Sequence, residues 1–132
     1  MKRRLIYFGL AALVMVSIAI AAVLSRYNAF KESNGLAVTL EWARLSSLPV
    51  SARDVSVVVE GSKFTRAFRT KFSLPVDELR HWIADSPGPS STTPQVDGVT
   101  YFYSIEPGGG AQHAEMTVNM DTGEVRIYVY WS

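Results

Sequence analysis

The sequence contains no cysteine among its 132 residues. This absence excludes a disulfide framework, a zinc site built on thiolates, a cysteine nucleophile and a lipidated cysteine near the N-terminus. The sequence patterns of phosphate-binding loops, serine hydrolases and zinc proteases are missing as well. Only 19% of the residues are charged and 48% are hydrophobic. The chain is therefore expected to fold as one small domain that packing alone stabilises.

The longest uncharged run extends from Leu5 to Leu24 and follows the basic residues Lys2, Arg3 and Arg4. A helix over this run spans about 30 Å, which is the thickness of the hydrocarbon core of a bilayer. We therefore predict a transmembrane helix that contacts the lipid bilayer through residues 5–24. The basic residues before it predict a cytoplasmic N-terminus and an extracytoplasmic C-terminal part.

Two alternatives to a membrane anchor remain open. The triplets at residues 19–21 and 21–23 loosely resemble the small-residue sites at which a secretory signal is cleaved. Cleavage there would release a secreted soluble binding domain, although the apolar run is long for a signal sequence. A helix buried in a soluble protein is the other alternative, but about 105 residues offer little core to surround it.

The sequence predicts three segments. Residues 1–27 form the basic start and the signal anchor, residues 28–35 form a tether that ends in a turn at Asn34-Gly35, and residues 36–132 form an extracytoplasmic domain. After Arg26, nine basic residues stand against twelve acidic ones. This balance, without a basic-aromatic motif, argues against nucleic-acid binding.

Apolar periodicity in residues 36–132 predicts an α+β fold. A ββαβββ order follows a short helix over residues 36–45, with one antiparallel or mixed sheet and helix packed on one face. The expected strands cover residues 55–60, 63–72, 100–106, 114–120 and 124–131, and the expected helix covers residues 75–85. A two-residue turn at Gly61-Ser62 joins the first two strands, and residues 86–98 form a flexible loop.

Alternation along the strands predicts which side chains point inward. Val55 should share an inward face with Val57, Phe64 with Phe68, and Trp131 with Val129. The expected core is Val57, Phe68, Phe72, Leu79, Trp82, Ile83, Val118, Ile127 and Val129.

Few residues suggest chemistry. His81 should face solvent from its helix, whereas His113 and Glu115 point to the same side of a strand. Two such ligands are too few for a metal site. Gly108-Gly109-Gly110 leads into a strand instead of a helix and is interpreted as a flexible connection, not as a phosphate loop. We expect no catalytic residue, no cofactor and no metal.

The strand faces turned away from the core offer the best candidate for a binding surface. Tyrosine and arginine are enriched where protein partners bind. The alternative is that these positions are ordinary solvated ones, or that the segment over residues 36–45 covers the tyrosines. The chain is thus expected to be a membrane-anchored, non-enzymatic accessory or interaction module, and a small hydrolase acting on the cell envelope is a further alternative. The candidate partner surface comprises Arg69, Lys71, Arg126, Tyr128 and Tyr130.

Overall fold

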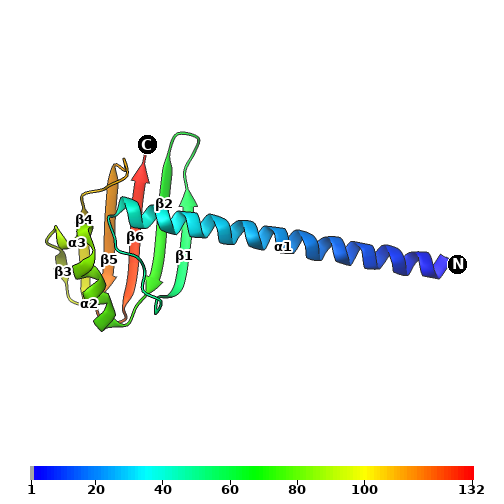
Figure 1. The fold of residues 1–132 in the computed structure, drawn as a ribbon, viewed down its shortest axis with the longest axis horizontal. Helices are drawn as coiled ribbons and strands as arrows, with labels where there is room; N and C mark the ends of the chain where they lie inside the picture. The colour runs from blue at the N-terminus through cyan, green and yellow to red at the C-terminus, as the bar shows by residue number, and fades with distance from the viewer. Residues whose placement is uncertain (1) are drawn as a thin grey trace. The chain divides into compact units, whose positions relative to one another are not determined.

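The computed structural model describes residues 2–132, with side chains from residue 6 onward. Contacts divide the chain into two compact units, Met1–Ser33 and Asn34–Ser132, which are described separately. The elements in the described residues are shown in Figure 1. They are the helices α1 (Lys2–Trp42), α2 (Val76–Asp85) and α3 (Pro87–Ser90), and the strands β1 (Arg53–Glu60), β2 (Arg66–Ser73), β3 (Gln95–Asp97), β4 (Thr100–Ile105), β5 (His113–Asn119) and β6 (Glu124–Trp131).

The first unit is the N-terminal part of α1. Its apolar side chains between Ile6 and Leu24 are exposed, and the helix is long and apolar enough to cross a membrane. The hydroxyl of Ser17 donates a hydrogen bond to the carbonyl of Leu13 at 2.9 Å, so this polar group is satisfied within the helix. An apolar helix over the predicted run is therefore confirmed.

The predicted tether and turn over residues 28–35 are wrong, because these residues are helical. The expected separate helix over residues 36–45 is instead the end of α1, which stops at Trp42. Gly35 is buried here, and a Cβ atom at this position would lie 2.7 Å from Cγ1 of Val57 in β1. Asn34-Gly35 thus permits a close approach of helix to sheet, where local sequence alone suggested a turn.

The second unit contains a six-stranded antiparallel sheet with the order β1-β2-β6-β5-β4-β3. The α+β class is therefore correct, but the expected ββαβββ order missed two elements. Both α3 and β3 lie in residues 86–98, which were predicted to be a flexible loop. Tertiary contacts order this segment, since the amide of Gly88 donates to the carbonyl of Arg44 at 2.8 Å and β3 pairs with β4.

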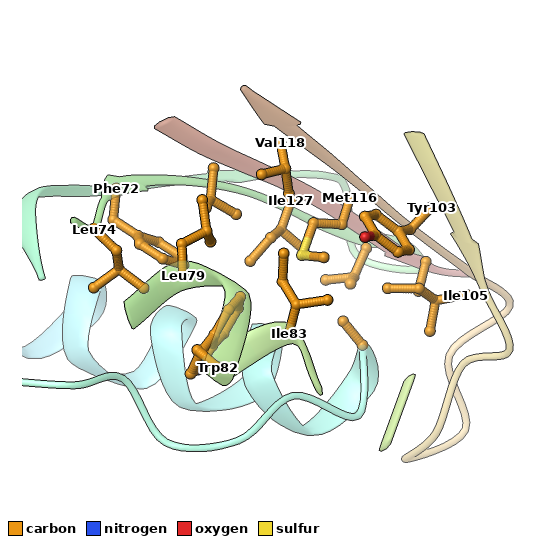
Figure 2. Packing of buried hydrophobic residues seen from close by; sticks show 14 of the residues in the cluster. Phe72, Leu74, Leu79, Trp82, Ile83, Tyr103, Ile105, Met116, Val118 and Ile127 are labelled. Carbon is orange, nitrogen blue, oxygen red and sulfur yellow. The ribbon is translucent and has the colours of Figure 1, made fainter. Parts of the chain in front are cut away.

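All nine predicted core residues are buried in one cluster between the helices and one face of the sheet. Figure 2 shows Phe72, Leu79 and Trp82 in this layer. The rings of Phe72 and Trp82 meet edge to face, with centroids 5.4 Å apart. The indole of Trp82 also donates to the carbonyls of Ser46 and Ser47, at 3.1 and 3.2 Å, which ties α2 to the connection after α1.

Three side chains that were predicted to point into the core are exposed, so these predictions were wrong. Phe64 is 79% exposed because residues 61–65 form a longer loop, and β2 starts only at Arg66. Val55 is 41% exposed because the β1–β2 register shifts between Arg53 and Ser56, which is a bulge. Trp131 is also 41% exposed, as the last residue of β6.

The substitution Trp82→Ala is predicted to lower the free energy of unfolding by about 3–5 kcal/mol, since it leaves a cavity against Phe72 and removes two hydrogen bonds. Urea unfolding of the full chain in detergent, followed by circular dichroism, measures this loss. Trp131→Ala is the matched control and is expected to cost less than about 1 kcal/mol. Equal losses in the two variants would contradict the packing of α2.

Candidate functional site

The sheet has two different faces. The helices pack on the face that carries Phe68, Thr70 and Phe72 in β2. The other face, called the open face below, carries the alternate residues of the strands. By the strand registers it comprises Ser56, Val58 and Glu60 of β1, Ala67, Arg69 and Lys71 of β2, Glu124, Arg126, Tyr128 and Tyr130 of β6, His113, Glu115 and Thr117 of β5, and Phe102 and Ser104 of β4.

The open face brings together all five residues that were predicted as a partner surface. Antiparallel pairing of β2 with β6 sets Arg69 opposite Tyr128 and Lys71 opposite Arg126, and Tyr130 lies opposite Ala67. The guanidinium carbon of Arg69 lies 4.4 Å from the centroid of the Tyr128 ring, which is a cation–π contact.

The last part of α1 does not cover the tyrosines of the open face. The Thr39 hydroxyl of α1 lies 2.9 Å from the Thr70 hydroxyl, and Thr70 points to the helical side of the sheet. The alternative in which residues 36–45 shield Tyr128 and Tyr130 is therefore wrong.

Two carboxylates on the open face pair with its basic residues. Glu60 lies 3.2 Å from Nε of Arg69. Glu124 lies 2.7 Å from Nε of Arg126 and 3.5 Å from Nζ of Lys71. Sequence reasoning missed both acids, although their positions at alternate sites along β1 and β6 place them on this face. The pairs are exposed, so water screens them and each contributes little to the stability of the fold.

A hollow of about 350 Å³ lies on the open face across β1, β2, β6 and β5. Basic, acidic and aromatic side chains surround it together: Arg69, Lys71, Arg126, Glu115 and Tyr128 line it. The chemistry available there is hydrogen bonding and ion pairing to a polar side chain or main chain, with an aromatic ring at one wall.

The two histidines occupy different surroundings. His113 lies on the open face, with Nε2 3.0 Å from a carboxylate oxygen of Glu115 and its ring centroid 5.9 Å from that of Tyr128. His81 is exposed on α2, as predicted, with Nδ1 2.8 Å from the carbonyl of Asp77. Within residues 2–132 no group of three or more histidine, aspartate or glutamate side chains is placed to hold a metal ion.

The glycine run from Gly108 to Gly110 has a structural role at the end of α1. The amide of Gly108 donates to the carbonyl of Trp42 at 2.8 Å, and a Cβ at Gly109 would lie 2.6 Å from the Trp42 ring. The run therefore caps a helix C-terminus and makes room for an indole ring, which its interpretation as a flexible connection did not foresee.

A second hollow lies between α2 and the connection that follows α1. It has a volume of about 880 Å³ and is lined by Glu78, His81, Trp82 and Asp85 among others. The Ser51 hydroxyl donates to Glu78 at its margin. Leu45, Pro49 and Pro87 line it as well, so it is a mixed apolar and acidic groove on the helical side of the sheet, away from the predicted partner surface.

No family model, no curated protein and no solved structure matches the chain. Any function of the open face is therefore inferred from its own residues.

The hydrogen bond from Arg126 lowers the pKa of the Glu124 carboxyl, and the charges of Arg126 and Lys71 act in the same direction. We predict that Arg126→Ala raises this pKa toward its ordinary value, whereas Arg69→Ala, which removes the partner of Glu60, leaves it unchanged. An NMR titration of the Glu124 carboxyl carbon measures both.

The lowered pKa of Glu124 also sets the sign of a pH effect on stability. A carboxyl with a depressed pKa in the folded state stabilises the fold above its unfolded-state pKa, and this contribution is lost as the pH falls through the folded-state pKa. The difference in unfolding free energy between wild type and Arg126→Ala should therefore shrink on acidification. A Glu124 pKa that is identical in wild type and Arg126→Ala would contradict the pairing.

Proposed function

We propose that the chain is a single-pass membrane protein whose helix crosses the bilayer through residues 5–24. In this proposal the N-terminus is cytoplasmic, and the α+β domain lies outside the cytoplasm as a non-enzymatic interaction module. The domain binds a protein partner on the open face.

The exposed apolar surface of α1 supports the membrane anchor. Side chains on every side of the helix between Ile6 and Leu24 are exposed, with no second layer of chain against them in the described residues. Exposing this surface to water costs free energy, about 25 cal/mol per Å² of apolar area. Contact with the hydrocarbon of a bilayer removes this cost. Basic residues before the run support the orientation.

The composition and placement of the open face carry the proposal of partner binding. Tyr128 lies between the guanidinium of Arg69 and the ring of His113 and borders a hollow that can receive a partner's side chain. Tyrosine and arginine are the residue types that supply most binding energy at protein interfaces. The ion pairs around Tyr128 are exposed, so a partner can exchange its own charges with them at little cost in free energy.

The anchor is tested by inserting a charge into the apolar run. Val14→Arg should reduce membrane insertion, since arginine at the centre of a helix costs about 2.5–3.5 kcal/mol on insertion scales, whereas Val14→Leu should insert normally. Carbonate extraction of membranes followed by immunoblotting measures the retained fraction. A mature chain that begins near Ala22 or Val23 would refute the anchor and support the secreted alternative.

Partner binding is tested with a photoreactive amino acid at Ser104, an exposed position on the open face. Crosslinking in native membranes should give a discrete species that the double variant Arg69→Ala/Tyr128→Ala loses without a change in melting temperature. The matched control is Arg80→Ala/His81→Ala, which alters exposed residues of α2. A crosslinked species that survives in the Arg69→Ala/Tyr128→Ala variant would contradict binding on the open face.

A further inference from the structure

The two edges of the sheet differ in length and composition. β3, at one edge, has only three residues and lies between Pro94 and Gly98. β1, at the other edge, has eight residues and includes four valines, of which Val58 is 54% exposed. Natural sheets protect an edge by keeping it short or by placing proline or lysine there. β3 is short in this way, whereas β1 is long, with a bulge near its start and charged residues only at its two ends.

The outer main chain of β1 is free of hydrogen bonds in the described structure. Within residues 2–132, the main chain from Arg53 to Glu60 forms hydrogen bonds only with β2. In an antiparallel ladder, alternate residues direct their N–H and C=O groups away from the partner strand. β1 therefore presents a row of donors and acceptors at which another strand can pair.

The side chains along this edge have a defined order. By the β1–β2 register, Arg53 begins the edge and Glu60 ends it on the open face, with Ser56 and Val58 between them. Val57 points to the helical side. The middle of the edge is thus apolar or neutral. Arg53 at its start is in no ion pair of the described residues, although Asp54 follows it in the strand, and Glu60 at its end forms an exposed ion pair with Arg69.

We propose that the outer edge of β1 binds an extended segment of a partner protein as a seventh, antiparallel strand. The bound segment carries a basic residue opposite Glu60, β-branched residues opposite Ser56–Val59, and an acidic residue opposite Arg53. Main-chain hydrogen bonds supply the affinity and the two charges set the direction and register. This site uses the outer main chain of β1, whereas the proposed binding at the open face centres on Arg69 and Tyr128. The side chains of Ser56, Val58 and Glu60 border both sites.

A second copy of β1 would offer the same order of charges. In an antiparallel pairing centred between Ser56 and Val57, the Arg53 of one chain would face the Glu60 of the other. However, Gly35 of α1 lies directly against Val57. A two-fold axis between Ser56 and Val57 would therefore bring both copies of α1 to the same place above the sheet, closer than the roughly 8–10 Å that two packed helix axes need. A single partner strand brings no such helix, so the structure favours a partner over a copy.

The probe for this site is a synthetic segment with the order lysine, valine, threonine, valine, threonine, valine, glutamate, flanked by solubilising residues and a fluorophore. Its binding to the full chain in detergent micelles is measured by fluorescence anisotropy. Arg53→Glu should weaken binding about fivefold, and replacing the peptide's glutamate by lysine should restore it. Methylation of the peptide's main-chain nitrogens on one strand edge should abolish binding, and methylation on the other edge should not.

Matched controls separate the edge from the rest of the sheet. Gln95→Glu at the β3 edge and Arg126→Ala on the open face should leave peptide binding unchanged, and hydrogen exchange should show new protection of β1 amides when the peptide is bound. The proposal would be overturned if Arg53→Glu left the affinity for the peptide unchanged. It would also be overturned if the peptide still bound whichever of its two edges was methylated. Absence of binding at about 1 mM peptide would also overturn the proposal. Dimers of the chain alone with protected β1 amides would overturn it too, because they would assign the edge to a second copy.

Discussion

The close approach of α1 to the sheet is the constraint on which the rest of the domain depends. Gly35, Thr39 and Ala43 follow one another at intervals of four residues and are all buried. They form a stripe of small residues along one side of the helix and its C-terminal end. A Cβ at Gly35 would meet Val57 at 2.7 Å, and the Thr39 and Thr70 hydroxyls lie 2.9 Å apart. The small side chains allow the helix to cover the core.

That packing also decides which surfaces of the sheet stay exposed. With α1 and α2 on one face, the sheet keeps its charged and aromatic residues on the other, where Arg69 and Tyr128 contact each other. The edge strand β1 lies under Gly35, so its inner face is covered while its outer main chain is free. One helix thus provides the apolar run that can cross a membrane and the layer that leaves an open face and an open edge.

Periodicity predicted those elements that local residues specify. The apolar stripe of Leu79, Trp82 and Ile83 predicted α2, and the alternation in β6 predicted its inward side. The prediction failed where a distant contact overrides a local signal. Asn34-Gly35 has the composition of a turn but is helical because Val57 and Phe68 lie against it. β3 has no apolar pattern of its own and is a strand because it pairs with β4.

The sequence by itself determined the apolar run of α1 and the placement of Arg69, Lys71, Arg126, Tyr128 and Tyr130 on strand faces opposite the core, because an alternation of period two depends only on neighbouring residues. Only the tertiary structure decided that β2 pairs with β6, which joins these residues into one surface with Glu60 and Glu124. It also decided that β1 is an edge. Strand order and register depend on contacts between residues far apart in the chain, and local periodicity carries no information about which strands become neighbours.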